Sequence, residues 1–268
     1  MSEPLCLVSR NLETLSNGNL AIAKIPYHAK DEIGNIVRST EKLKLNFHTI
    51  INQIHSISVG NYDLKIKRLS QEDQLTDALL EMTHILRTAT EQNERQNWLK
   101  TGQTLLNEKM RGEQTPVELA KHVIHFLCRH LDAQIGLFYQ YDALDNKMRM
   151  LANYAYSQRK DVSNEFALGT GIIGQVALEK EMIMITDIPK DYINIKSGLG
   201  TLTPKTLIVI PFLYEEKLKG IIELGFIEEQ LYDTKIDFLK QVMPSIAITM
   251  NSAELSIAQM NVRDEIND

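Results

Sequence analysis

The sequence predicts an all-α region of parallel coiled-coil helices, forming a four-helix bundle as a dimer, followed by an α+β domain with a central antiparallel sheet. Three observations lead to this fold. The N-terminal part repeats itself with an offset of 42 residues, which superposes Gly18 on Gly60. Long segments carry apolar residues at alternating steps of three and four. After Gly112 and Pro116 this spacing gives way to short strand-like runs.

Composition sets the first limits. With 268 residues, 43% of them apolar, the chain can bury a core, and its net charge of −6 argues against nucleic acid or an anionic membrane as partner. The two cysteines, Cys6 and Cys128, are far apart, which suits a reducing compartment without disulfides. No run approaches the roughly 18 apolar residues that span a bilayer, so we expect a cytoplasmic segment without direct membrane insertion.

Each copy of the repeat consists of a helix, an extended connector that begins at glycine, and a second helix with an acidic start. Asp31 follows Gly18, and Asp73 follows Gly60, by 13 residues in both copies. Negative charge is favourable at a helix N-terminus because of the helix dipole. Neither glycine nor proline interrupts residues 35–59, so the second helix of copy one also serves as the first helix of copy two.

The apolar seam of these helices, and of a final helix after residue 236, predicts a parallel homodimer through which a signal could pass. Gln92, Gln96 and Gln103 interrupt the seam; they either set a register suited to switching or mark a solvated linker helix. The seam residues that we expect to form the dimer and relay contact are Leu12, Leu15, Ile33, Ile36, Leu43, Phe47, Ile50, Ile54, Leu75, Met82, Ile85, Leu239, Ile246 and Met250.

Both helices and strands are expected after residue 116. An amphipathic helix is expected at 117–131, a short glycine-marked helix at 169–179, and a last helix with a seam up to Met260, kinked at Pro244. Helix, strands, helix and strands in this order predict an antiparallel α+β sheet domain. The expected strands are residues 134–141, 147–155, 182–186, 206–214 and 218–226.

The N-terminal repeat resembles HAMP domains, the relay modules of bacterial receptors. The first copy, residues 1–52, matches through Pro4, Gly18, a connector with Leu20, Ile22 and Ile25, and the signature Asp31-Glu32-Ile33-Gly34. The second copy, residues 47–92, shares a helix with the first and keeps Gly60, Leu64, Ile66 and Asp73. It lacks the proline and has Gln74-Leu75-Thr76 at the signature, as in divergent members of concatenated arrays.

Residues 116–253 resemble a GAF domain. The resemblance lies in Gly169-Thr170-Gly171 with Gly174, in Ile185-Thr186-Asp187, and in a hairpin at 207–226 that contains Pro211, Gly220 and Glu223. The segment Asn97-Trp98-Leu99-Lys100-Thr101-Gly102 resembles the linker before such domains in hybrid histidine kinases. Residues 93–115 are then a linker helix, and residues 254–268 begin an output coiled coil.

Together these resemblances imply a non-catalytic relay segment of a bacterial two-component sensor, feeding a downstream histidine kinase domain in cis. They also imply a membrane helix before Met1 in a parent protein of the inner membrane. One alternative stays open: the GAF-like domain is a small-molecule sensor, and the helices are a dimerisation scaffold.

Motifs for catalysis are absent from the sequence. None of the seven histidines precedes Asp or Glu, and no phosphate-binding Gly-Lys-Ser/Thr loop occurs. Ser157 and Ser197 have no neighbouring His–acid pair. His122 and His125 fall on the solvent face of their helix, so we expect no metal site and no cofactor. A pocket could still be lined by five aromatic residues, whose alternative role is to fill the core: Tyr139, Tyr154, Tyr156, Phe166 and Tyr192.

Overall fold

A computed structural model describes residues 3–156, 164–186, 188, 195–197 and 200–267. The chain divides into two compact units, Met1–Glu94 and Arg95–Asp268. Each is described by itself. In the described part of the chain, no helix is both long and apolar enough to cross a membrane.

The first unit consists of α1 (Glu3–Ser16), α2 (Glu32–Ser58) and the beginning of α3 (Gln74–Lys109), joined by extended connectors. Both connectors begin in the same way. Gly18 and Gly60 have φ angles of 76° and 88°, and their N–H groups donate to Leu15 and Ile57 carbonyls at 2.9 Å. A side chain is strained in this left-handed conformation, so glycine ends both helices.

The two following helices also begin alike. The Asp31 carboxylate accepts from the Gly34 N–H at 2.8 Å and from the Tyr27 hydroxyl at 2.6 Å. Asp73 accepts from the N–H groups of Thr76 at 3.1 Å and Leu69 at 2.9 Å. Hydrogen bonds lower the pKa of both carboxyl groups. The largest cause is the bond from the Tyr27 hydroxyl for Asp31 and the bond from the Thr76 hydroxyl for Asp73, and the backbone N–H groups add to the effect. The 42-residue sequence repeat is therefore also a repeat of local structure.

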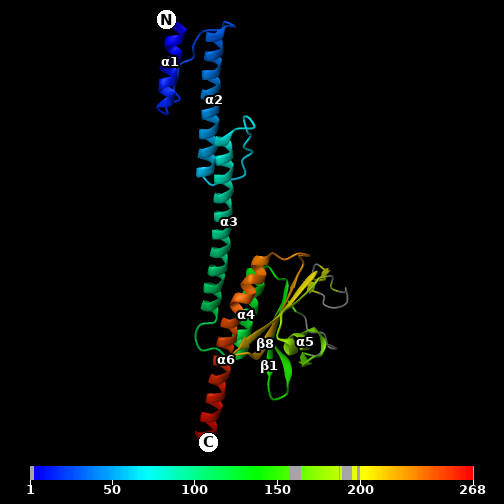
Figure 1. Ribbon diagram of the computed structural model, residues 1–268. Coiled ribbons are helices and arrows are strands. Elements are labelled where there is room, and N and C mark those ends of the chain that lie inside the picture. The colour runs from blue at the N-terminus through cyan, green and yellow to red at the C-terminus, as the bar shows by residue number, and fades with distance from the viewer. Residues whose placement is uncertain (1–2, 157–163, 187, 189–194, 198–199, 268) are drawn as a thin grey trace. The chain divides into compact units, whose positions relative to one another are not determined.

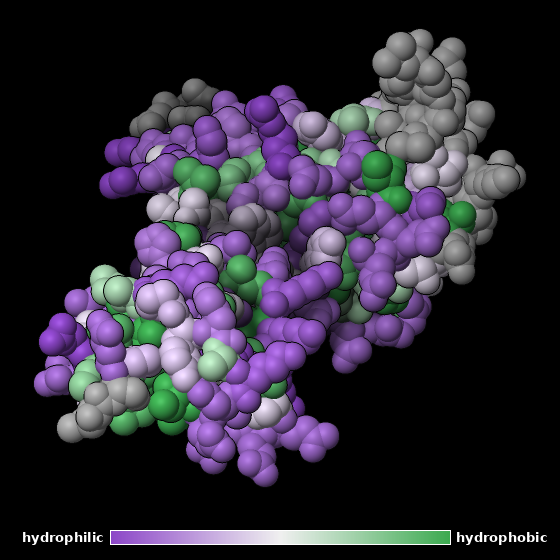
Figure 2. Space-filling model, turned by 90° about the horizontal axis from the view of Figure 1, so that it is seen from above, coloured by the Kyte–Doolittle hydropathy of each residue, from purple (hydrophilic) through white to green (hydrophobic). Residues whose placement is uncertain are grey.

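One face of these helices is covered by the connectors and the other is open. Val37 and Leu79, which correspond in the repeat, are 2% and 5% exposed. Seven of the expected seam residues are exposed, and Figure 2 shows apolar side chains reaching the surface between hydrophilic ones. Ile33, Phe47 and Ile50 are half-buried and Leu15 is buried. The seven exposed residues, here called the open seam, are Leu12, Ile36, Leu43, Ile54, Leu75, Met82 and Ile85.

The second unit is an α+β domain with an antiparallel sheet, as the sequence predicts. Figure 1 shows α4 and α6 on one side of the sheet and α5 on the other. The strand order of the six-stranded sheet is β3-β2-β1-β8-β7-β4. Its strands are β1 (Ile135–Asp142), β2 (Lys147–Tyr154), β3 (Glu165–Ala167), β4 (Ile183–Thr186), β7 (Thr206–Tyr214) and β8 (Lys217–Phe226). The remaining elements are α4 (Pro116–Leu131), α5 (Gly171–Glu179), α6 (Asp233–Asn267) and a separate hairpin of β5 (Ile195–Ser197) and β6 (Gly200–Leu202).

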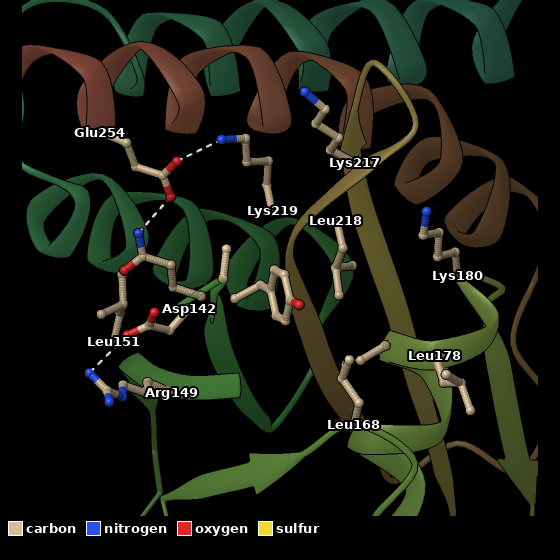
Figure 3. A pocket seen from close by; sticks show the side chains of 14 residues that line it. Asp142, Arg149, Leu151, Leu168, Leu178, Lys180, Lys217, Leu218, Lys219 and Glu254 are labelled. Carbon is tan, nitrogen blue, oxygen red and sulfur yellow. Dashed lines mark hydrogen bonds and ion pairs between the residues drawn. The ribbon is translucent and has the colours of Figure 1, made fainter. Parts of the chain in front are cut away.

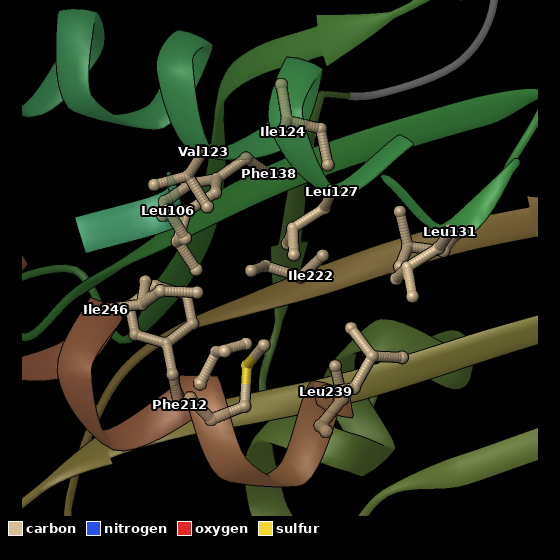
Figure 4. Packing of buried hydrophobic residues seen from close by; sticks show 14 of the residues in the cluster. Leu106, Val123, Ile124, Leu127, Leu131, Phe138, Phe212, Ile222, Leu239 and Ile246 are labelled. Carbon is tan, nitrogen blue, oxygen red and sulfur yellow. The ribbon is translucent and has the colours of Figure 1, made fainter. Parts of the chain in front are cut away.

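The larger core of this unit lies between the sheet and the helices α3, α4 and α6. Figure 4 shows Leu106 of α3 beside Phe212 of β7 and Ile246 of α6. All three side chains are 0% exposed. Burial of each such side chain stabilises the fold by roughly 1.5–3 kcal/mol. The C-terminal half of α3 is therefore a structural part of this domain.

One group of expected seam residues was assigned wrongly. Leu239, Ile246 and Met250 of α6 are 0% exposed because they pack onto the chain's own sheet. They are not available for contact with a second chain. Beyond Ala253 the helix leaves the core, and Leu255 is 55% exposed.

The three shortest strands β3, β5 and β6 are absent from the sequence prediction. Each has three residues, too few to show a period-two pattern. The five longer strands and the three helices of this unit lie within a few residues of the predicted ranges. The last helix continues through Pro244.

Aromatic rings join α3, α4 and α6. The His130 ring of α4 stacks on Trp98 of α3 at a centroid distance of 4.5 Å and on Phe126 at 5.3 Å. Phe238 of α6 lies 4.7 Å from His130. Burial lowers the pKa of His130, although nearby Asp132 opposes the shift. Its Nε2 atom is buried with no hydrogen-bond partner among the described residues. We call Trp98, His130 and Phe238 the aromatic junction.

The aromatic junction requires a glycine at residue 102. A Cβ atom there would overlap Nε2 of His130 and lie 2.6 Å from Cε2 of Phe238. We predict that Gly102→Ala lowers the free energy of unfolding by about 1–3 kcal/mol through overpacking, despite a helix-propensity gain of up to about 1 kcal/mol. Urea unfolding followed by emission of Trp98, the chain's single tryptophan, measures this.

The matched control is Thr101→Ala, at an exposed position of the same helix. A surface change of this kind is expected to stay within about 0.5 kcal/mol of the wild type. Equal stability of the two variants would contradict the packing argument.

Candidate functional site

The sheet face that α5 covers holds three of the five aromatic residues proposed to line a pocket. Tyr139 of β1 and Phe166 of β3 meet edge to face, with ring centroids 5.7 Å apart. Tyr156 packs against the same apolar cluster. Tyr154 lies on the other side of the sheet, against His125 of α4 at 5.3 Å. Tyr192 lies outside the described residues.

A glutamate stands in the middle of this face. Glu223 of β8 pairs with Leu137 of β1 and Val209 of β7, so apolar strands flank it on both sides. It is 3% exposed, and its carboxyl group accepts a hydrogen bond from the Tyr139 hydroxyl at 3.3 Å. Tyr139, Phe166 and Glu223 are called the sheet-face site.

Burial dominates the electrostatics of this site. It raises the pKa of Glu223 to about 7, and the hydrogen bond from Tyr139 only partly opposes the shift. The carboxyl group is therefore divided between its neutral and ionised forms near neutral pH. It can donate a hydrogen bond in one form and attract a cation in the other. Perturbed carboxyl groups of this kind cluster at functional sites.

Sequence reasoning placed Glu223 in the hairpin but assigned it no chemical role. A signal was present, since this glutamate is the single charged residue in the run from Gly220 to Phe226. A charge inside a strand that is apolar on both faces has to be buried. The pKa shift itself depends on the strands at either side, which periodicity does not give.

The glycines near α5 have structural roles. Gly169 and Gly171 have φ angles of 76° and 63°, and the Gly169 N–H donates to the Gly174 carbonyl at 2.8 Å. A Cβ at Gly174 would overlap the Ala167 carbonyl oxygen. The three glycines make the turn into α5, where the sequence predicts a short glycine-marked helix.

An open pocket of about 910 Å³ lies at the ends of β1 and β8. In Figure 3, Lys219 of β8 reaches Glu254 of α6. The Lys219 ammonium lies 2.8 Å from the Glu254 carboxylate, and both side chains are largely buried. The Gln140 amide donates to the second carboxylate oxygen at 2.6 Å. Two strands thereby fix α6 where it leaves the core.

Reactive and metal-binding groups are few. Burial raises the pKa of Cys128 to about 12, so this thiol stays protonated at neutral pH. Cys6 is exposed. His122 and His125 lie on the exposed face of α4, as the helical spacing predicts. Within the described part of the chain, no three histidine, cysteine, aspartate or glutamate residues gather where they could hold a metal ion.

Comparison with known proteins identifies the domain. The GAF domain family matches residues 113–251. The GAF domain of a phosphoenolpyruvate-protein phosphotransferase from Coxiella burnetii is similar, with 19% identity, a TM-score of 0.51 and coverage of 61% of this chain and 98% of that one. This likeness concerns the fold. No curated protein matches the sequence.

Two further solved structures resemble the same part of the chain. A GAF domain of A. aeolicus in an inactive state has 20% identity and a TM-score of 0.47, over 60% of this chain and 99% of that one. A free methionine-R-sulfoxide reductase from Neisseria meningitidis has 14% identity and a TM-score of 0.45, over 60% and 91%.

The raised pKa of Glu223 predicts a pH-dependent stability. Because the folded state keeps its proton up to about pH 7, the stability that this group contributes at low pH is lost as the pH rises from its unfolded pKa, near 4.5, through 7. Glu223→Gln, which stays neutral, should therefore gain about 2–3 kcal/mol relative to wild type between pH 5 and pH 8. Urea unfolding at the two pH values measures this.

The control for this experiment is Glu181→Gln, at an exposed position. Its stability relative to wild type should not change with pH. The burial argument fails if the Glu223→Gln difference is equally independent of pH.

Proposed function

The chain belongs to the GAF domain family, and from this premise we propose that it is a non-catalytic sensor and relay segment. In this proposal, a conformational signal enters through α3, changes the packing of the GAF domain and leaves through α6. The segment acts on an output domain that follows it in its parent protein. GAF domains commonly serve as signalling modules.

One observation carries this proposal: the helices that lead into and out of the GAF domain also build its core. Leu106 near the end of α3 is 0% exposed, as are Phe238 and Ile246 of α6. A rotation or shift of α3 has to repack these side chains, because close-packed interiors do not deform continuously. The aromatic junction connects α3 to α6 through the His130 ring and through a direct edge contact between Trp98 and Phe238, with ring centroids 5.4 Å apart.

Two further contacts support a path through α6. The Arg95 guanidinium of α3 forms an ion pair with Asp237 at the start of α6. At the other end of the core, Lys219 and Gln140 hold Glu254. A change at the entry helix can thus act directly on the start of the exit helix, while two strands of the sheet hold the residue at which the exit helix leaves the core.

We propose that residues 1–92 are two HAMP-like units that supply the signal. Support comes from the repeated helix ends at Gly18 and Gly60 and the repeated helix starts at Asp31 and Asp73. Support for a parallel homodimer comes from the open seam, which a four-helix bundle of two chains would cover.

The parent protein in this proposal is a histidine kinase of a two-component system. The support is the resemblance of the segment from Asn97 to Gly102 to the linkers of hybrid kinases. Trp98 of this segment belongs to the aromatic junction and Gly102 packs against it, which gives the motif a physical role at the entrance to the GAF domain.

A second candidate function is the sensing of a small molecule by the GAF domain itself. The sheet-face site favours it, because a buried carboxyl group beside aromatic rings can bind a ligand that carries a positive charge or a hydrogen-bond donor. The helices would then be a dimerisation scaffold and an output path.

The dimer can be tested at the open seam. We predict that the chain elutes in size-exclusion chromatography with light scattering at about twice 30.6 kDa, because an exposed apolar stripe of this length favours association. The double variant Ile36→Asp, Met82→Asp should be monomeric, since it places charges in the apolar contact.

The matched control is Leu45→Asp, at a residue that is 65% exposed and lies outside the seam. This variant should remain dimeric. A wild-type chain that is monomeric at all concentrations would contradict the proposed dimer.

The relay can be tested by removing the carboxylate at the start of α3. Asp73→Ala eliminates the hydrogen bonds to Thr76 and Leu69. If the helix transmits the change, the emission of Trp98 should shift and hydrogen exchange in residues 253–260 should become faster. The control is Glu72→Gln, an exposed neighbour. Unchanged Trp98 emission and exchange in Asp73→Ala would show that α3 does not couple the two units.

A further inference from the structure

The outer side of α4 carries a groove of unusual composition. Its volume is about 630 Å³, and six of its seven lining side chains are nitrogen bases. Lys121 and Arg129 come from α4, and Lys109 is the last residue of α3. His122, His125 and His130 supply imidazole rings, and Phe126 supplies an apolar wall. Among the described residues, no carboxylate lines the groove, although acidic residues outnumber basic ones, 35 to 29, in the chain.

The lysine and arginine side chains of this groove have no ion-pair partner within the described part of the chain, although Glu118 interacts electrostatically with Lys121 from a greater distance. Lys109, Lys121 and Arg129 form neither an ion pair nor a side-chain hydrogen bond with a described residue. Other cations of the chain do, such as Lys219 with Glu254 and Lys205 with Glu229. Like charges held at one concave surface repel one another and create a positive potential that attracts anions.

Local hydrogen bonds orient two of the imidazole rings. The Nδ1 atom of His122 lies 2.8 Å from the Gln114 side-chain oxygen, and that of His125 lies 2.8 Å from the Lys121 carbonyl oxygen. Since both oxygens can only accept, Nδ1 carries the proton in each ring. Nε2 is then the atom left for a ligand, and in a protonated ring it donates.

One carboxylate close to the groove in sequence is already engaged. Glu118, four residues before His122, accepts hydrogen bonds from the Thr115 N–H at 3.0 Å and hydroxyl at 2.9 Å. It caps α4 and does not line the groove. The groove therefore offers several donors and, among the residues that the structure describes, no carboxylate in its lining.

We infer that this groove is a binding site for a small, multiply charged anion of the phosphate class. Phosphate oxygens accept from lysine, arginine and imidazole donors together. A concave site of this volume suits a free small molecule, whose apolar part would contact Phe126. Because Lys109 ends α3 and the other residues lie on α4, a bound anion ties the end of the entry helix to the GAF domain. The site is separate from the sheet-face site.

The test is titration of the full chain with pyrophosphate, by calorimetry and by thermal unfolding, against sodium chloride at matched ionic strength. We expect saturable heat and a rise in Tm beyond the chloride control. Arg129→Gln and Lys121→Gln should each weaken binding about tenfold, the size of one charge-assisted contact. Lys217→Gln, which removes a lysine of the pocket in Figure 3, should bind as the wild type does.

Three results would overturn the inference. The first is a Tm rise equal to that in chloride, and the second is the same loss of affinity in Lys217→Gln as in Arg129→Gln. The third is sedimentation with phosphatidic acid vesicles without any binding of pyrophosphate, since the groove would then bind a lipid headgroup at a membrane surface. None of these results bears on the relay through α3 and α6.

Discussion

The packing of α3, α4 and α6 against one face of the sheet is the constraint on which the rest of the GAF domain depends. Leu106, Leu127 and Ile246, one from each helix, are all 0% exposed in a single apolar cluster. Without the end of α3 or the first half of α6, the sheet would expose that face to water. The helices that enter and leave the domain are therefore part of its core. A movement of either helix has to change the packing of that core.

The opposite face of the same sheet contains a buried ionisable group. Its cluster is also apolar, but it contains Glu223, whose burial raises its pKa to about 7. An apolar residue of similar size would pack there without a desolvation penalty. The carboxyl group thus weakens the fold at neutral pH, where its proton is half lost. The main core and the cluster around Glu223 lie on opposite sides of strands β1 and β8. A change of charge at Glu223 therefore acts on strands that also carry Phe138 and Ile222 of the main core.

Sequence patterns predicted the helices and the longer strands well, because these elements contain enough residues to show a hydrophobic period. The repeat was visible because Gly18 and Gly60 must adopt left-handed backbone conformations, a local requirement. The aromatic site was predicted only in part. Tyr139 and Tyr154 both come from strands of the sheet, yet they face opposite sides because Tyr154 pairs with Gly136, which lies three residues from Tyr139 on β1. No local pattern gives this pairing register, and none shows that Glu223 would lie between apolar strands.

Seam residues with the same helical spacing are exposed in one helix and buried in another. Ile36 and Ile246 both belong to stripes with steps of three and four, yet the first is 42% exposed and the second 0%. The helical period says which residues share a face, but not what covers that face. For α6 the cover is its own sheet, since β7 and β8 precede it in the chain and lie beside it. Unit Met1–Glu94 has no sheet among its described residues. Its connectors cover one side of each helix, and the remaining apolar side is the surface on which the proposed association of two chains rests.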